Sequence, residues 1–180
     1  TSMARNKRGN RKSEYAMMEL ELLSVLAEKA GKAYPTEELN RMWEMILTNQ
    51  FHDILPGSSI HEVYEQTKKE YAEIAETSAK LIGERLDALC AKKDESVTVW
   101  NTLGHRRNDI VELGTNSAEA LTDGTNVYPV QQTKDGAVIY AENLPSKGYQ
   151  VLRPVSGSGV KTPFAIAEAG EGYTLETPFY

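Results

Sequence analysis

The sequence predicts an α+β protein, in which an antiparallel three-helix bundle is followed by a partial, sandwich-like all-β unit. Two observations lead to this fold class. Residues 13–92 hold three stretches in which apolar side chains recur every three or four positions, as they do on amphipathic helices. From residue 95 onward, short alternating segments with β-branched and aromatic side chains are separated by turn sequences. We therefore expect a helical domain with a basic lead-in over residues 1–94, and the start of a β-sandwich region over residues 95–180.

The first helix is expected over residues 13–30, a stretch without Gly or Pro that is rich in helix-forming residues. Ser13 is a plausible N-cap, and Gly31 is a natural stop. Spacings of three and four place five side chains on one apolar face: Tyr15, Met18, Leu22, Val25 and Leu26.

The second helix should begin at Thr36, directly after Pro35, and end near Phe51. Glu37 and Glu38 fall in its first turn, where the helix dipole favours negative charge. Its apolar stripe consists of Leu39, Met42, Trp43, Ile46 and Leu47.

The third helix is predicted to extend from Ser59 to about Lys92, with Gly83 as a mild weakness. Ser59 and Glu62 have the Ser-x-x-Glu spacing of a capping box. Such a long helix can pack within a bundle or pair with a second copy as a coiled coil. The two other amphipathic helices favour packing within the chain, and a homo-oligomer stays open. The near-heptad series comprises Ile60, Val63, Tyr64, Thr67, Tyr71, Ile74, Ser78, Leu81, Ile82 and Leu89.

Five later segments have the pattern of strands: SVTVWN, DIVEL, VYPVQQ, AVIYAENL and GYQVLRP. Turns are marked by Asp123-Gly124, Asp135-Gly136 and Lys147-Gly148, and residues 155–163 are expected to form a loop. The chain opens with Thr-Ser before Met3 and closes on YTLETPFY, the pattern of a strand just starting. We therefore expect an excerpt of a longer protein.

Composition argues against several classes of function. A net charge of −6 speaks against nucleic acid as the main partner. No apolar run approaches the roughly 20 residues that span a bilayer, and no signal-peptide pattern is present. Cys90 is the single cysteine, which leaves no intrachain disulfide and suits a cytoplasmic setting. The basic run at residues 5–12 has the charge of a phosphate-binding arm but not its aromatic or Gly pattern, so we expect a solvated lead-in, or a segment whose acidic partners lie elsewhere.

The feature that most needs explaining is the adjacent pair His52 and Asp53 in the stretch LTNQFHDILPGSSI. Imidazole is the commonest metal ligand, and a carboxylate can share a metal or bind hydroxyl groups. His52 could equally cap helix carbonyls, and Asp53 could organise the turn before Pro56. His61 and His105 complete no recognised zinc spacing, although a site built from His52, Asp53 and His61 alone remains an alternative. No phosphate loop or nucleophile motif occurs, so the chain contains no complete active site.

The string NQFHDILPGSSI resembles a signature of glycoside hydrolase family 38, the retaining α-mannosidases, whose bacterial and vacuolar-type members carry almost the same string. The opening TSMARNKRGNRKSE is similar to the passage from that family's catalytic β/α barrel into its helical middle domain. The stretch VTVWNTLGHRRNDIVEL is similar to the start of its β-rich C-terminal region, although Asn101-Thr102-Leu103 stands where the family commonly has Asn-Pro-Leu. The resemblance covers about residues 1–113, with the three pieces in the right order.

The resemblance implies a full-length enzyme that hydrolyses terminal α-mannosidic bonds of carbohydrate substrates. It implies that His52 is a ligand of a catalytic divalent metal, usually zinc, and that Asp53 contacts substrate hydroxyls. The nucleophile, the acid/base and the other metal ligands belong to the family's barrel. We therefore expect no catalytic residue in this chain and no activity from it alone. We expect the protein to be cytoplasmic and bacterial, without membrane or nucleic-acid partners.

Two alternatives stay open. Within the family, some bacterial members hydrolyse mannosylglycerate and related small glycosides, and nothing in this chain separates these substrates from glycans. Outside it, the chain could be a free-standing helical interaction module in which His52 and Asp53 are only structural. Its basic N-terminus and its long third helix would then be the binding features.

Overall fold

The structure, a computed structural model, describes residues 3–90, 95–156, 165–170 and 172–177. The chain divides into two compact units, Thr1–Lys92 and Lys93–Tyr180. The first holds three helices and the second holds antiparallel sheets, so the α+β fold class predicted from the sequence is confirmed. The predicted domain boundary after residue 94 falls at residues 91–94, which lie outside the described residues. Among the described helices, none is long and apolar enough to cross a membrane.

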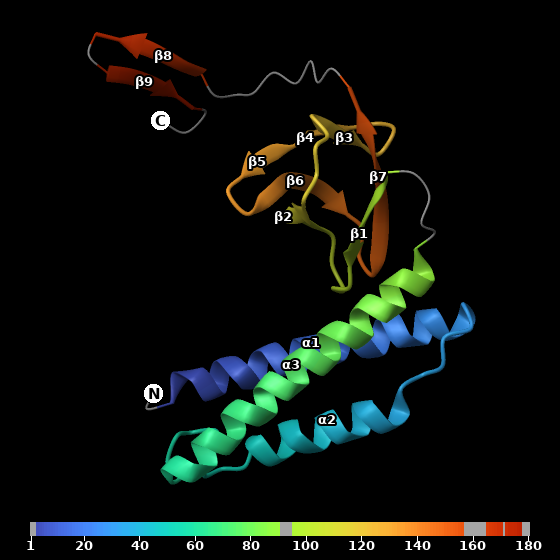
Figure 1. Cartoon of the computed structure of the whole chain (residues 1–180), viewed down its shortest axis with the longest axis vertical. Helices are drawn as coiled ribbons and strands as arrows, with labels where there is room; N and C mark the ends of the chain where they lie inside the picture. Colours follow the sequence, from blue (N-terminus) through green and yellow to red (C-terminus); the bar gives the residue numbers. More distant parts are fainter. Residues whose placement is uncertain (1–2, 91–94, 157–164, 171, 178–180) are drawn as a thin grey trace. The chain divides into compact units, whose positions relative to one another are not determined.

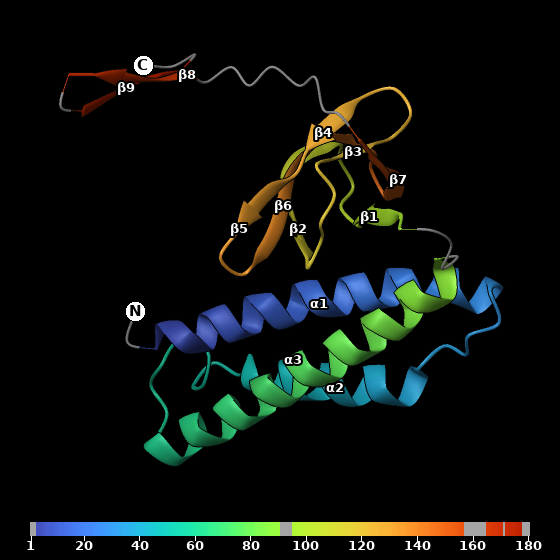
Figure 2. The same ribbon diagram turned by 45° about the horizontal axis from the view of Figure 1, so that its top comes forward.

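The first unit is an antiparallel three-helix bundle of α1 (Ala4–Lys29), α2 (Thr36–Asn49) and α3 (His61–Leu89). α2 runs back along α1, and α3 runs forward again beside both helices (Figures 1 and 2). All three helices contribute to one core, so α3 packs within the chain as expected. The buried residues of this core are Met17, Leu20, Leu39, Met42, Ile46, Tyr71 and Ile74.

α1 differs from the prediction in its start and in its buried face. It begins at Ala4 rather than at Ser13, because the basic segment contains good helix formers and its Asn side chains find partners inside the bundle. Tyr15, Met18 and Val25, predicted to face the core, are at least half exposed. The buried stripe of α1 includes four polar residues, so a search for apolar spacing does not detect it. That stripe comprises Asn6, Asn10, Ser13, Met17, Leu20, Leu23, Ser24 and Ala27.

The remaining helix ends are explained by local hydrogen bonds. Gly31, at φ +85°, stops α1 as predicted, and Lys32 N donates to the Ala27 carbonyl. The predicted capping box of α3 is wrong: Ser59 donates its backbone N–H to the Tyr64 hydroxyl at 2.8 Å, and the helix begins at His61. α3 ends at Leu89, three residues before the predicted Lys92, which lies outside the described residues.

Two helical glycines give a stability prediction with opposite signs. A Cβ added at Gly9 of α1 would lie 2.6 Å from the Tyr71 ring, whereas one added at Gly83 of α3 meets nothing within 4 Å. Gly9→Ala should therefore destabilise the bundle by about 1–3 kcal/mol through overpacking. Gly83→Ala should stabilise it by about 0.5–1 kcal/mol, because alanine is the better helix former. Urea unfolding monitored by helical circular dichroism measures both, and two changes of the same sign would contradict the close α1–α3 contact.

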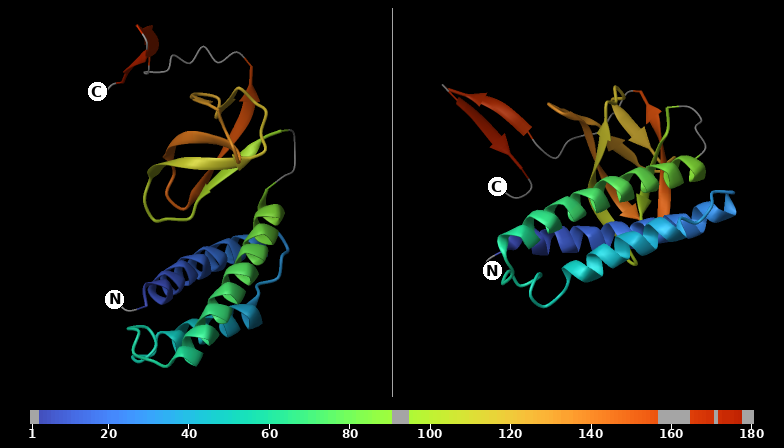
Figure 3. Two further views of the ribbon diagram at one scale, coloured as in Figure 1. Left: turned by 60° about the vertical axis from the view of Figure 1, so that its left-hand side comes forward. Right: turned by 60° about the horizontal axis from the view of Figure 1, so that its bottom comes forward.

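In the second unit, a four-stranded and a three-stranded sheet face each other (Figure 3). One sheet has the order β1-β7-β3-β4 and the other β2-β6-β5, all antiparallel. Residues of both sheets share a core, which is the sandwich-like arrangement expected. The strands are β1 (Val97–Asn101), β2 (Arg107–Gly114), β3 (Ala120–Thr122), β4 (Val127–Pro129), β5 (Gln131–Thr133), β6 (Gly136–Leu144) and β7 (Gly148–Val155).

The strand assignments differ from the prediction in three places. The segment VYPVQQ forms two strands, β4 and β5, in different sheets, because the chain crosses between the sheets at Val130, which packs on the shared core. β3 is absent from the predicted strands, because three residues are too few for a recognisable period-two pattern. β8 (Ala165–Ala169) was not predicted, and it pairs with β9 (Gly172–Glu176) near the predicted final strand. The predicted loop lies almost wholly at residues 157–164, outside the described residues.

Asn101 is a buried polar residue that joins the two sheets of this unit. Its Nδ2 donates to the carbonyl oxygens of His105 and Pro145, both at 2.9 Å, and its Oδ1 accepts the N–H of Leu103 at 3.2 Å. The side chain therefore shapes the turn after β1 and ties it to the end of β6. This role rests on Asn101 rather than on Thr102, which stands where the resemblance leads one to expect Pro.

Asp123 is the centre of a turn between β3 and β4, and it gives a pH-dependence prediction. Its carboxylate accepts hydrogen bonds from the backbone N–H groups of Asn126 and Thr125 and from the Tyr128 hydroxyl. These bonds hold the pKa of Asp123 well below its usual range, and the bond from the Asn126 backbone has the largest effect. A lowered folded-state pKa stabilises the fold above the unfolded value of about 4, and this contribution is lost as pH falls further.

The thermal stability of the β unit should therefore fall more steeply below about pH 4 in the wild type than in Asp123→Asn, as measured by thermal unfolding. Asp135→Asn, at the turn between β5 and β6, is the matched control and should follow the wild type. Equal slopes for wild type and Asp123→Asn would show that this carboxylate does not contribute to acid sensitivity.

Candidate functional site

The His-Asp pair lies in the loop between α2 and α3, directly after the end of α2 at Asn49. Phe51 to Gly57 form successive turns, in which the N–H groups of Ile54 and Leu55 donate to the Phe51 carbonyl at 2.9 and 3.1 Å. Gly57 adopts φ +105°, a left-handed conformation that favours glycine, as the chain turns towards α3. The loop lies beside the first turns of α1 (Figures 1 and 2).

The side chains of His52 and Asp53 point away from the core. They are 77% and 61% exposed, and His52 Nε2 lies 3.4 Å from Asp53 Oδ2. The Phe51 ring, itself exposed, contacts the imidazole with 4.4 Å between ring centroids. Neither side chain caps α2: the last carbonyls of that helix accept from the backbone N–H groups of Gln50 and Phe51 instead. The imidazole and the carboxylate are therefore available to a ligand.

The segment before the pair is held by two side-chain amides. Asn49, 2% exposed, donates to Glu70 Oε2 of α3 at 2.8 Å. Gln50 uses both hydrogens of its amide, because its Nε2 donates at 2.9 Å to Asn10 Oδ1 and at 2.9 Å to Glu14 Oε1, both on α1. The end of α2 is thus fixed to both neighbouring helices.

The segment after the pair is held through backbone carbonyls. Asn6 Nδ2 of α1 donates to the Ile54 carbonyl at 3.4 Å, and Lys7 Nζ donates to the Pro56 carbonyl at 3.4 Å. Asn6 is itself oriented by Thr67 of α3, whose hydroxyl donates to Asn6 Oδ1 at 2.8 Å. Asn6 and Thr67 are 2% and 1% exposed, so their polar groups bond within the protein rather than to water.

The chain alone does not assemble a metal site within the residues that the structure describes. No group of three or more His, Cys, Asp or Glu side chains there could hold a metal ion. His61 is exposed at the start of α3, and His105 is exposed in the turn after β1. The alternative site of His52, Asp53 and His61 is therefore not formed. An exposed imidazole fits the role of one ligand to zinc, which needs three or four.

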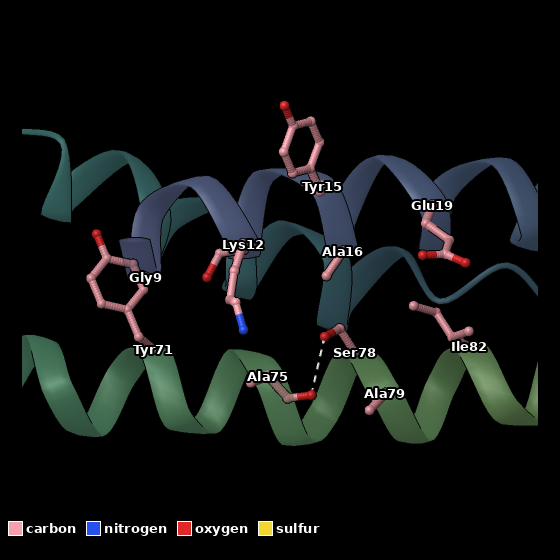
Figure 4. A pocket seen from close by; sticks show the side chains of 11 residues that line it. Gly9, Lys12, Tyr15, Ala16, Glu19, Tyr71, Ala75, Ser78, Ala79 and Ile82 are labelled. Atoms are coloured by element: carbon pink, nitrogen blue, oxygen red, sulfur yellow. Dashed lines mark hydrogen bonds between the residues drawn. The ribbon is translucent and has the colours of Figure 1, made fainter. Parts of the chain in front are cut away.

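A separate groove of about 420 Å³ lies between α1 and α3 (Figure 4). Its walls carry small side chains, among them Gly9 and Ser78, whose hydroxyl donates to the Ala75 carbonyl of its own helix. Burial raises the pKa of Glu19 at its edge, and burial first, then Glu70 and Glu14, raises the pKa of Tyr71 to about 12. Neither His52 nor Asp53 lines the groove, so it is not part of the candidate site.

Sequence reasoning located the exposed pair but missed the residues that support it. Asn6, Asn10 and Thr67 were missed because polar residues on a buried stripe look like solvent-facing positions in a single sequence. One signal was available: Asn6, Asn10 and Ser13 continue the three-and-four spacing of Met17 and Leu20. The basic segment was interpreted as a solvated lead-in or as a segment whose acidic partners lie elsewhere. It is the part of α1 that contacts the loop, and Arg5 within it lies 3.6 Å from Glu65 of α3.

Comparison with known proteins identifies the helical unit. Residues 1–89 match the family model "Alpha mannosidase middle domain". Human "Alpha-mannosidase 2C1" is 36% identical over 117 residues, covering 63% of this chain and 11% of the human protein. "Alpha-mannosidase G" of Dictyostelium discoideum is 24% identical over 185 residues, covering 88% of this chain and 17% of that protein.

A solved structure extends the similarity beyond the helices. A protein "in the Glycosyl Hydrolase Family 38" from Enterococcus faecalis superposes with a TM-score of 0.71 at 13% identity, covering 91% of this chain and 26% of that one. At this identity the match shows that the fold is shared.

These findings define an α-mannosidase middle domain followed by sandwich-like sheets. The chain belongs to the α-mannosidase middle domain family, which its residues 1–89 match, and it shares the fold of the glycosyl hydrolase family 38 structure. It spans about a tenth of the length of the human and mouse relatives.

Proposed function

We propose that this chain is the helical middle domain and the start of the β-rich region of a retaining, metal-dependent α-mannosidase. In that enzyme the loop between α2 and α3 supplies His52 as one metal ligand and Asp53 as one contact to substrate hydroxyls. The relatives bear the name α-mannosidase, which supports hydrolysis of terminal α-mannosidic bonds over a free-standing interaction module. The single cysteine, Cys90, supports a cytoplasmic location.

One observation carries the assignment of the two residues. The backbone around His52 and Asp53 is tied down by hydrogen bonds to α1 and α3, yet both side chains are largely exposed. A purely structural pair would spend its polar atoms on the loop, whereas here other residues hold the loop. A rigid scaffold that presents exposed polar side chains is the arrangement a ligand site requires.

The division of labour follows from the chemistry of the side chains. A neutral His52 imidazole offers a nitrogen lone pair to a metal, and zinc bound there would polarise or orient sugar oxygens as a Lewis acid. Asp53, when ionised, accepts hydrogen bonds from substrate hydroxyls, which fixes the sugar relative to the reacting bond. A retaining glycosidase also needs two carboxyl groups about 5–5.5 Å apart, and we assign both to the remainder of the enzyme.

The proposed function is tested by assaying the full-length enzyme and this chain side by side with an aryl α-mannoside. We expect the full-length enzyme to release α-mannose, with net retention visible by NMR of the first-formed sugar, and this chain to release none. Mannosylglycerate in the same assay separates a small-glycoside enzyme from one acting on glycans. A full-length enzyme with no activity on any α-mannoside would contradict the proposal.

A further inference from the structure

The basic first half of α1 contacts the loop that carries the His-Asp pair, although neither sequence pattern nor resemblance gives it a role there. Four hydrogen-bonded attachments to the helices, which we call tethers, flank the pair. Before it, the side chains of Asn49 and Gln50 donate to α3 and α1; after it, the carbonyls of Ile54 and Pro56 accept from α1. Three of the four end on α1, and the fourth ends on α3. Three residues lie between the inner tethers, and the side chains of all three, Phe51, His52 and Asp53, are exposed.

The tether made by Asn6 is built from buried polar groups, which destabilise the fold if they lose their partners. Asn6 and Thr67 are almost fully buried, and they satisfy each other across α1 and α3 before Asn6 reaches the loop. The Thr67 hydroxyl has one proton, which lies within reach of Asn6 Oδ1 at 2.8 Å and of the Tyr64 carbonyl at 3.1 Å. The Ile54 carbonyl can only accept, so Asn6 Nδ2 faces it, and the Thr67 hydroxyl, which donates to Asn6 Oδ1 at the shorter distance, holds the amide in that orientation.

We propose that Asn6, Thr67 and Gln50 are positioning residues for the proposed function of His52 and Asp53. Thr67 orients Asn6, Asn6 holds the Ile54 carbonyl, and Gln50 fixes the end of α2 through Asn10 and Glu14. Together they set where the exposed imidazole stands. A metal ligand must be held within fractions of an ångström, so loosening this support weakens binding without removing a ligand.

Thr67→Val is the principal test, because it removes the hydroxyl and keeps the shape of the side chain. Ser78→Ala is its matched control: it also removes a buried hydroxyl from α3, but one that bonds only within its own helix. Gln50→Met removes the tether to Asn10 and Glu14 at a half-buried position, and it provides an independent variant if Thr67→Val does not fold.

Hydrogen–deuterium exchange of the full-length enzyme, followed by mass spectrometry, reads the loop directly. We expect Thr67→Val and Gln50→Met to speed exchange in a peptide covering residues 51–56 by about tenfold, the size of one lost hydrogen bond. Peptides from the middle of α2 should be unchanged, and Ser78→Ala should match the wild type throughout. Wild-type exchange of the loop in both tether variants would overturn the positioning role.

Zinc affinity, measured by competition with a chelator, reads the consequence for the site. We expect Thr67→Val to raise the zinc dissociation constant by about 10–100-fold, as loss of a supporting partner does at other metal sites, with no change for Ser78→Ala. A looser loop with unchanged zinc affinity would make the tethers merely structural and overturn the proposal. If His52→Ala left zinc affinity unchanged, the proposed function would fail instead, and the exchange measurement would still decide whether these residues hold the loop.

Discussion

His52→Ala in the full-length enzyme should raise the zinc dissociation constant and lower kcat/KM by more than about 100-fold, the upper end of what losing a mere supporting partner costs. The effect should be large because zinc has only three or four protein ligands, so one imidazole is a major part of the shell. Thermal stability of the helical unit should change little, since the side chain is 77% exposed and does not contribute to the core.

His61→Ala is the matched control for this variant. His61 is also an exposed imidazole close to the loop, but it begins α3 and has no role in the proposed site. Metal content by atomic emission and kinetics with an aryl α-mannoside should therefore match the wild type for His61→Ala. Wild-type activity and metal content in His52→Ala would remove the ligand assignment.

Asp53→Asn should separate substrate contact from metal binding. We expect turnover to fall by about 10–100-fold, because a hydrogen bond to a charged acceptor contributes about 1.5–3 kcal/mol and becomes weaker when the acceptor is neutral. Zinc content should stay close to one per enzyme, since His52 is unaltered. Removal of the Asp53 charge should also leave the loop intact, because the contact that holds this residue is made by its backbone carbonyl with Ser58 Oγ at 3.4 Å.

Kinetics with an aryl α-mannoside and metal analysis of the same preparation test this separation. Unchanged kinetics in Asp53→Asn would exclude the substrate-hydroxyl role. Loss of zinc together with loss of activity would instead make Asp53 a metal ligand, which is the other chemistry open to a carboxylate beside an imidazole.

The fold followed closely from the sequence wherever apolar spacing was clear. α2 begins at Thr36 as predicted. Leu39, Met42 and Ile46 of its predicted stripe are buried, whereas Leu47 is 61% exposed. Prediction was wrong where polar residues occupy the core, as at Asn6 and Ser13, because hydrophobic periodicity cannot detect a buried amide whose partner lies far along the chain. The Thr67 hydroxyl that donates to the buried Asn6 amide, for example, is 61 residues away in the sequence.

Short strands and buried charges set a second limit to what the sequence alone could yield. β3 has three residues and owes its existence to pairing with β4 and β7 rather than to its own propensity. Arg85, 3% exposed, would be read from the sequence as solvent-facing, yet its Nη2 donates to the Ala33 carbonyl in the α1–α2 connection at 3.3 Å. Such contacts depend on the tertiary arrangement that they help to fix.

The candidate site shows the same division between what a motif can and cannot indicate. The string around His52 and Asp53 was sufficient to place both residues at the end of α2 and to suggest their roles. It could not indicate that the loop is held by the first half of α1. That depends on hydrogen bonds such as the one Gln50 donates to Asn10, 40 residues away in the chain. The residues proposed to bear the chemistry could be identified from the sequence, and the residues proposed to position them could not.

Zinc titration by isothermal calorimetry of this chain beside the full-length enzyme tests the central claim most directly. The claim is that His52 is one ligand of a site completed by other parts of the enzyme. It predicts tight, stoichiometric binding to the metal-free full-length enzyme and no tight binding to the 180-residue chain. Tight binding to the 180-residue chain alone would contradict it, because no group of described side chains brings three ligands together.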